Sequence, residues 1–274
     1  VFDASARNNQ GQSLNENLEP GPKTQRNLSH LNMHIRMKPV VLLCDIRRMY
    51  YSIFYDPTSE PRTKLKDNRD AFRFLWHKEP SEPPAVYRFR KMLMGSRCSP
   101  FQANSVIEHH LDMLIASSTD DEIIEACKLL KKFRYIDETL LSLDNPEQAI
   151  AITKAINKIF GEMGMKVTKF VSNSPELLET IPEQDRNPTT AIALQPNGIS
   201  DQLGSISDTT KIVGLCWNPE NDTLSFEQYK KLLEKEIPSS KRSISAIIPS
   251  IFDVNGEIEP YILRGKVILS ETWA

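Results

Sequence analysis

The chain has 274 residues, of which 34 are basic and 36 acidic, giving a net charge of −2. This balance excludes a positive field over the whole surface, so any site for a polyanion has to be local. The hydrophobic content of 39% can fill the core of one large or two smaller globular domains. No apolar run reaches the roughly 18 residues of a membrane-spanning helix, and no signal peptide precedes the first element.

The cysteines are far apart and form no Cys-x-x-Cys pair; they are Cys44, Cys98, Cys127 and Cys216. Most of them have apolar neighbours, which favours reduced, buried thiols over disulfides or zinc ligands. We therefore expect an intracellular, cytoplasmic protein. Because the chain begins at Val1 rather than at a methionine, we also expect it to be a piece of a longer protein.

The first half of the chain predicts one strand and two helices. Residues 40–46 (VVLLCDI) form a continuous apolar run, typical of a covered strand, that ends near Asp45. The polar, proline-rich stretch 56–84 predicts loops and short pieces outside the core, and ordered structure resumes at 87–95. Helices are predicted over about 100–117, with Ser99 as N-cap and Pro100 first, and over 120–133, which starts acidic and ends basic.

The second half begins with FRYIDETLLSL at 133–143, where Asp137 and Glu138 lie between two apolar runs, as in the turn of a β-hairpin. A helix capped by Asn145 follows over 145–164. The remaining predictions are strands at 165–172 and 212–218 and helices at 226–236 and 240–252.

This order of elements predicts an α+β fold in which helices cover one face of a sheet. In such a fold Asp45, at the end of one strand, can approach Asp137 in a neighbouring hairpin. Two carboxylates that meet need a compensating charge, and Mg²⁺ is suited to this role because it takes hard oxygen ligands.

Structural interpretations of the same residues stay open. An acidic pair between strands is most often a solvated turn, and Asp45 alone would suit a cap of the next turn. One of Tyr50 and Tyr51 is expected in the core. The adjacent His109 and His110 point in different directions on a helix, so we interpret them as structural rather than metal-binding.

Blocks with a common resemblance follow one another along nearly the whole chain. They are VFDASARNNQGQSLNENLEPGP (1–22), PVVLLCDIRRMYYSI (39–53), RFLWH (73–77), YRFRKMLMGSRCSPFQAN (87–104), YIDE (135–138), KFVSNSPELLETIP (169–182), KIVGLCWNPENDTLSF (211–226) and SKRSISAIIPSIFDVNGEIEPYILRGK (240–266). Each block alone is a weak signal. Together and in this order they resemble the reverse transcriptase of Pao/BEL-type LTR retrotransposons.

The resemblance implies a right-hand polymerase, with fingers and palm over 1–176 and a primer grip and thumb-like helical segment over 177–274. It implies RNA-directed DNA polymerase activity: metal-dependent transfer of deoxynucleotides to a primer 3′-end. The implied partners are an RNA or DNA template, a DNA or RNA primer and deoxynucleoside triphosphates, without a membrane. The protease, ribonuclease H and integrase parts of such a Pol polyprotein are expected to be absent from this chain.

The resemblance also implies roles for individual residues. Asp45 matches the metal-binding aspartate of the first palm motif, and Asp137 the first aspartate of the Tyr-x-Asp-Asp hairpin. Glu138 stands at the second aspartate. These carboxylates would hold two Mg²⁺ (or Mn²⁺) ions that activate the primer hydroxyl and neutralise the triphosphate.

Further residues match positions that contact the substrate. Tyr50 matches the aromatic ring under the incoming sugar, which excludes a 2′-hydroxyl. The other matches are Gly95, Arg97, Ser99, Pro100, Phe101 and Lys169. With Arg97, the basic residues Arg88, Arg90 and Lys91 are expected to provide local positive charge.

The chain departs from the family at two points. Glu138 replaces an aspartate, and its added methylene shifts the carboxylate by a distance that can cost on the order of 100-fold in rate. The family places basic residues just before the first block, upstream of Val1. The alternatives are therefore a catalytically decayed or domesticated fragment that binds nucleic acid or is structural, and a helical protein-interaction domain.

Overall fold

The structure is a computed structural model that describes residues 3–55, 68–187, 210–212, 215–225, 240–248, 251, 253 and 255–272. The chain folds as two compact units. Unit 1 consists of Val1–Gln25, Ile46–Asp137 and Ile152–Val167, and unit 2 of Arg26–Asp45, Glu138–Ala151 and Thr168–Ala274. The helix predicted at 226–236 lies outside the described residues.

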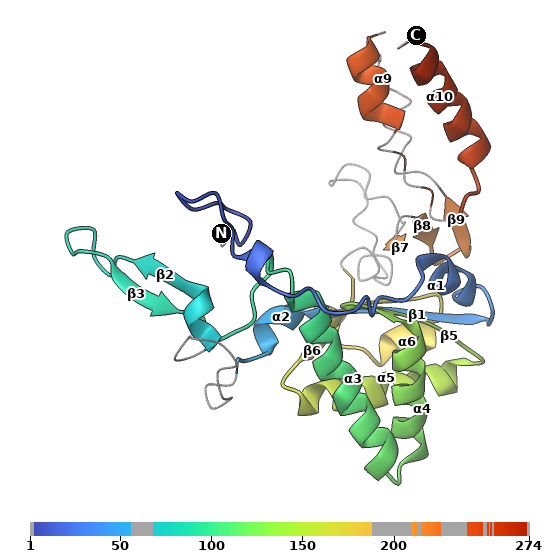
Figure 1. The fold of residues 1–274 in the computed structure, drawn as a ribbon. Helices are drawn as coiled ribbons and strands as arrows, with labels where there is room; N and C mark the ends of the chain where they lie inside the picture. The colour runs from blue at the N-terminus through green and yellow to red at the C-terminus, as the bar shows by residue number, and fades with distance from the viewer. Residues whose placement is uncertain are drawn as a thin grey trace. The chain divides into compact units, whose positions relative to one another are not determined.

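A four-stranded sheet has the order β4-β5-β1-β6 (Figure 1). Its strands are β4 (Arg134–Tyr135), β5 (Glu138–Leu143), β1 (Val40–Arg47) and β6 (Lys166–Ser172). β1 pairs antiparallel with β5, so that Val40 faces Leu143 and Asp45 faces Glu138. The strands predicted at 40–46 and 165–172 are confirmed, as is the hairpin that contains Asp137.

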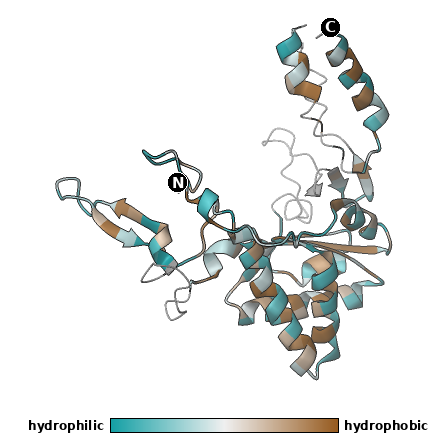
Figure 2. Ribbon diagram, viewed as in Figure 1, coloured by the Kyte–Doolittle hydropathy of each residue, from teal (hydrophilic) through white to brown (hydrophobic). Residues whose placement is uncertain are grey.

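The core follows from the apolar runs of these strands. In β1 every residue from Val40 to Cys44 is buried, and Leu42 faces Leu141 with both side chains 0% exposed. Figure 2 shows the corresponding hydrophobic residues along β1 and β5. Burial at consecutive positions means that both faces of β1 are covered by other parts of the protein.

Unit 1 contains a helical pair and a separate β-ribbon. Its further elements are η1 (Asn15–Asn17), α2 (Met49–Ser52), η2 (Asn68–Phe72), β2 (Arg73–Trp76), β3 (Ala85–Arg88), α3 (Ser99–Ser117) and α4 (Asp121–Phe133). The long helices α3 and α4 lie side by side (Figure 1). The Asp120 carboxylate accepts hydrogen bonds from the first amides of α4, and Ile107 and Leu111 of α3 are fully buried.

Besides its sheet strands, unit 2 contains further helices and strands that precede or follow them in the sequence. They are α1 (Leu28–His34), α6 (Pro175–Glu179), η3 (Glu183–Asp185), β7 (Thr210–Ile212), β8 (Leu215–Asn218), β9 (Thr223–Ser225), α9 (Lys241–Ile247) and α10 (Glu259–Glu271). β8 lies between β7 and β9 in an antiparallel sheet. Strand β8 confirms the last part of the strand predicted over 212–218, whereas Ile212 ends β7. Helix α9 confirms the first part of the helix predicted over 240–252. Helix α5 (Pro146–Glu162) confirms the helix predicted over 145–164, and it runs from unit 2 into unit 1.

Three predictions need correction. The N-cap of α3 is Cys98, because the hydroxyl of Ser99 is buried and donates to the Leu93 carbonyl at 2.7 Å. The stretch 56–84 contains strand β2, and Phe72 belongs to the core because its ring stacks on Tyr55 with centroids 5.0 Å apart. Neither tyrosine of α2 is buried, since Met49 takes the inward position of that short helix.

Candidate active site

Asp45 and Glu138 face each other at the end of the β1–β5 ladder. They are Cα partners in the antiparallel register, Asp45 near the end of β1 and Glu138 at the start of β5. Directly opposed residues project to the same face of a sheet, and like charges in such a pair are destabilising. Here the folded sheet holds two carboxylates at one end of the ladder, and Asp45 retains a side-chain exposure of 20%.

Lys169 supplies a positive charge to this pair. Its Nζ lies 2.7 Å from Oδ2 of Asp45, and its own side chain is 61% exposed. The residue lies in β6 with a φ of 56°, a left-handed conformation that is uncommon for lysine. The sequence resemblance predicts Lys169 as a substrate-contacting residue. It does not predict the ion pair, which depends on β6 being the sheet neighbour of β1.

Asp137 belongs to the turn of the hairpin in unit 1. Its backbone carbonyl accepts a hydrogen bond from the Ile46 amide at 2.9 Å. The preceding residue, Ile136, has a φ of 55°. A β-branched residue rarely adopts this conformation, and such local strain persists only where surrounding contacts impose it.

Tyr50 lies near Asp137 within unit 1. It is half-buried in α2, and burial raises the pKa of its phenol, with a further contribution from the negative charge of Asp137. Its neighbour Tyr51 is 42% exposed. The structure therefore brings the predicted sugar-contacting ring into the electrostatic range of one predicted metal ligand.

The predicted substrate loop is attached to the N-terminal segment. Gly95 has a φ of 94°. The Asn15 side chain donates to the Gly95 carbonyl at 3.0 Å and accepts from the Arg97 amide at 2.8 Å. Pro100 lies in the first turn of α3. Gly95 and Arg97 are exposed, whereas the Ser99 side chain is buried and supports the loop from within. Sequence reasoning missed Asn15, whose role is visible only in these contacts.

The basic residues near this loop differ in their surroundings. Arg88 pairs with Asp70 at 3.1 Å, and the Lys91 ammonium lies 4.9 Å from the centroid of the Phe54 ring. Arg90 and Arg97 are exposed. The positive charge that these residues contribute is thus local, and part of it is already engaged with other side chains of the protein.

The cysteines do not take part in this chemistry. Cys44, Cys98, Cys127 and Cys216 are all free and buried, which confirms the prediction for their thiols. Burial is the main cause that raises the pKa of Cys44 to about 12, and the charge of Asp45 acts in the same direction. A thiol that stays protonated is a poor nucleophile.

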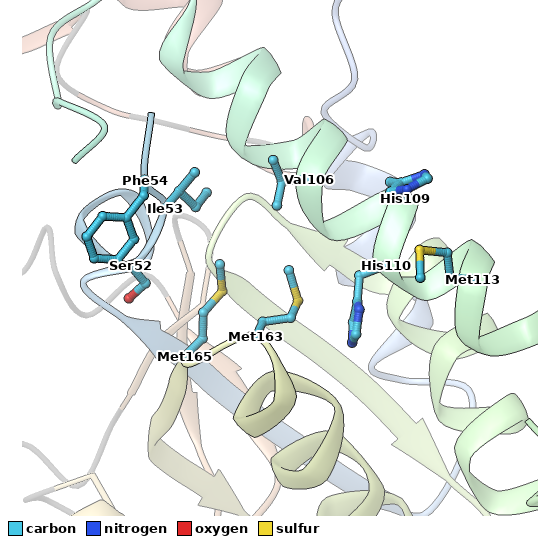
Figure 3. A pocket seen from close by; sticks show the side chains of 9 residues that line it. All are labelled: Ser52, Ile53, Phe54, Val106, His109, His110, Met113, Met163 and Met165. Atoms are coloured by element: carbon cyan, nitrogen blue, oxygen red, sulfur yellow. The ribbon is translucent and has the colours of Figure 1, made fainter. Parts of the chain in front are cut away.

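Unit 1 contains a pocket whose lining includes none of the predicted site residues. It has a volume of about 370 Å³ and lies between the segment after α2, helix α3 and the residues that follow α5 (Figure 3). The lining is mostly apolar, with three methionines; its residues are Ser52, Ile53, Phe54, Val106, His109, His110, Met113, Met163 and Met165. His110 also lies 3.7 Å from Glu162. The structural interpretation of the two histidines stays a prediction.

The donor set at the end of β1 suits a hard cation. In the part of the chain that the structure describes, no group of three or more His, Cys, Asp and Glu side chains is arranged to hold a metal. The described side chains there therefore do not form a complete set of protein ligands for a metal. Mg²⁺ in nucleotide enzymes needs only one or two carboxylates, because substrate phosphates and water complete its shell. The opposed carboxylates of Asp45 and Glu138 fit this second type of site.

Comparison with protein families places these observations in a known class. The family model "Reverse transcriptase (RNA-dependent DNA polymerase)" matches residues 5–170, more than half of the chain. The chain belongs to the reverse transcriptase family. Membership implies RNA-directed DNA polymerase activity in general, with template, primer and nucleotides as partners. A search of curated proteins gave no match.

None of the described helices is both long enough and apolar enough to cross a membrane.

Proposed function

We propose that the chain is the RNA-directed DNA polymerase domain of a retrotransposon of the Pao/BEL type. It would extend a DNA or RNA primer with deoxynucleotides on an RNA or DNA template. The observation that carries this proposal is the opposition of Asp45 and Glu138 at the end of a buried ladder, within the region that the family matches. The Pao/BEL assignment is supported by the ordered sequence blocks, and the division into 1–176 and 177–274 stays a prediction.

Asp45, Asp137 and Glu138 would hold the Mg²⁺ or Mn²⁺ ions, and carboxylate oxygens are the donors that these ions prefer. When bound, two ions would make the primer hydroxyl more acidic and balance the charge of the triphosphate. Within the protein, Tyr50 would exclude a ribose 2′-hydroxyl by its bulk. The Lys169 ammonium balances the charge of Asp45 in the structure, and it would be available to an anionic substrate once a cation takes its place.

The loop from Gly95 to Pro100 would orient the templating base and the incoming nucleotide. Its conformation is fixed from two sides, by the Asn15 side chain and by the buried Ser99 hydroxyl. A loop held in this way positions its exposed atoms before substrate arrives, which reduces the entropic cost of orienting the reactants.

The test is primer extension on an RNA template with Mg²⁺ and then Mn²⁺. The unchanged chain should extend, and Asp45→Asn should abolish extension because it removes a charged ligand. The matched control is Asp144→Asn, which removes an exposed carboxylate, paired with Lys38 at 2.6 Å, just after the other end of β5. This control should keep the rate. Equal extension by Asp45→Asn would contradict the proposal.

A second candidate, a domain that binds primer–template without catalysis, is favoured by one observation. Glu138 is longer than the aspartate of the family, and a displacement of about 1 Å can cost on the order of 100-fold in rate. Glu138→Asp should increase extension if the glutamate limits a working site. Primer–template binding that is independent of metal, with no extension by either variant, would support the second candidate.

A further inference from the structure

Arg134 is a buried cation at the start of the hairpin in unit 1. Its side chain is 3% exposed. The guanidinium donates to the backbone carbonyl of Ile136 and, at 2.8 Å, to Oδ1 of Asn104 in α3. Its other terminal nitrogen lies 3.2 Å from Oε1 of Glu108, one turn further along α3. One planar group thus connects the hairpin turn with a long helix.

The carbonyl that Arg134 holds belongs to the strained residue of the turn. Ile136 has a φ of 55°, and Asp137 follows it directly. A left-handed β-branched residue is strained and needs surrounding contacts to persist. The rigid fork of arginine is suited to impose such a geometry, because it fixes several acceptors at once.

The acceptors of Arg134 are themselves held. Nδ2 of Asn104 donates to Oγ1 of Thr24 at 3.0 Å. The second oxygen of Glu108 lies 3.5 Å from Nζ of Lys131 in α4. A buried guanidinium is tolerated only when it is paired and hydrogen-bonded. These contacts pair the charge of Arg134 and engage both terminal nitrogens of its guanidinium.

We propose that Arg134 is a positioning residue that fixes the turn of Ile136 and Asp137 and braces it against α3. Because α3 begins at Ser99, directly after the predicted substrate loop, the same helix would support both the nucleotide-contacting loop and the acidic turn. The catalytic consequence rests on the proposed polymerase function. The brace is a property of unit 1 that can be measured without catalysis.

The first readout is backbone amide exchange of the metal-free chain. Arg134→Met should speed exchange in the segment 134–140 by about tenfold or more, because it removes charge-assisted hydrogen bonds. Arg134→Lys should give a smaller effect, since an ammonium cannot serve the carbonyl and Asn104 in one fork. Lys132→Met changes an exposed neighbour on α4 and should leave exchange unchanged.

A second pair of variants separates the brace from general packing. Asn104→Leu removes the acceptor that Arg134 uses, whereas Thr24→Val removes only the distal hydrogen bond of Asn104. Asn104→Leu should therefore loosen the segment 134–140, and Thr24→Val should leave it close to the unchanged chain. This comparison remains decisive if Arg134→Met does not fold.

The second readout is the kinetics of primer extension. Arg134→Met should lower kcat on the order of 100-fold through misplacement of Asp137, while primer–template affinity stays within about twofold, and Arg134→Lys should recover part of kcat. Folded Arg134 and Asn104 variants with unchanged exchange at 134–140 would overturn the inference, as would unchanged kcat in an active chain. If the unchanged chain does not extend primers, the proposed function fails, and the exchange data still decide whether the brace exists.

Discussion

The strands of the four-stranded sheet and the β2–β3 ribbon show two ways of making antiparallel pairs. In β1 almost every side chain is buried, whereas in β2 and β3 most are exposed, among them Leu75 at 65% and Val86 at 62%. The ribbon depends on contacts between aromatic rings, such as those of Phe74 and Phe89, whose centroids lie 4.4 Å apart. A two-stranded ribbon alone is marginally stable, whereas the burial of apolar side chains stabilises the four-stranded sheet.

This difference explains where the acidic pair lies. Opposed carboxylates destabilise a ladder by a small amount, and only a strand pair with a large surplus of buried apolar contacts retains its register against that cost. The β1–β5 ladder has this surplus in leucines such as Leu42 and Leu141. The ribbon does not, and its exposed basic residues are joined to nearby side chains instead.

The largest effect on the free energy of unfolding is expected when a leucine of the sheet is truncated, compared with a leucine of the ribbon. Leu42→Ala should lower the free energy of unfolding by about 2–5 kcal/mol, because it opens a cavity next to Leu141. Leu75→Ala should change it by no more than about 0.5 kcal/mol. Denaturant titration of both variants measures the difference, and equal values would show that burial does not distinguish the two regions.

A glycine pair tests whether the N-terminal segment is packed like the sheet. A Cβ at Gly21 would lie 2.3 Å from Cγ of Phe101, and its φ is +74°. Gly21→Ala should therefore cost about 2–4 kcal/mol of unfolding free energy. Gly11 has a similar φ of +78°, and a Cβ added there would have no other atom of the described residues within 4 Å. Gly11→Ala should cost only about 1–2 kcal/mol in the same titration, and a smaller loss for Gly21→Ala would contradict the tight contact.

A pH titration of stability tests a buried polar residue of unit 2. Burial, with a smaller contribution from Lys38, lowers the pKa of His34 from 6.5 to about 4. The unfolded chain then binds a proton more readily than the folded chain. The contribution of His34 to the free energy of unfolding should be constant above pH 6.5. It should fall by up to about 3 kcal/mol between pH 6.5 and pH 4, and it should not fall further below pH 4.

Two histidine variants serve as test and control for this titration. His34→Gln should remove most of this fall, since glutamine can accept the Ser142 amide that now donates to the ring at 3.3 Å. His77→Gln changes an exposed histidine beside the ribbon and should keep the fall. Loss of the pH dependence in His77→Gln would show that His34 is not its source.

The smallest effect is expected for ion pairs. Lys169→Met breaks the pair with Asp45, and Arg88→Met breaks the pair between Arg88 of the ribbon and Asp70 of η2. Both should change the unfolding free energy by less than about 1 kcal/mol, because partly exposed pairs are screened by water. Calorimetric melting of both variants measures this change. A cost of several kcal/mol for Lys169→Met alone would indicate a structural role that its exposure does not predict.

The sequence predicts those parts of the fold that depend on local pattern. The apolar run of β1 and the acidic start of α4 identify their elements because burial and capping act over a few residues. Strand β2 was missed since its aromatic residues stand beside a long polar, proline-rich stretch and pair with a partner across a loop. The N-cap of α3 was placed one residue late because a serine hydroxyl can donate as well as accept.

The sequence predicts the residues of the candidate site and the approach of Asp45 to the hairpin, but it does not predict which hairpin residue faces Asp45. The blocks gave Asp45, Asp137, Glu138 and Tyr50, and the structure adds the facing register of Asp45 and Glu138 and the proximity of Tyr50 to Asp137. No sequence signal indicates the left-handed backbone of Ile136 and Lys169, or the contacts of Asn15. Most of these features depend on partners far away in the chain, which only the folded sheet and loops bring together.

The most direct measurement is manganese binding followed by electron paramagnetic resonance, with primer–template and a non-reactive deoxynucleotide analogue present. The account predicts that the unchanged chain and Asp144→Asn bind Mn²⁺ and that Asp45→Asn binds at least about tenfold more weakly, since a charged ligand is lost. Equal binding by Asp45→Asn would contradict the assignment of the β1–β5 end as the metal site.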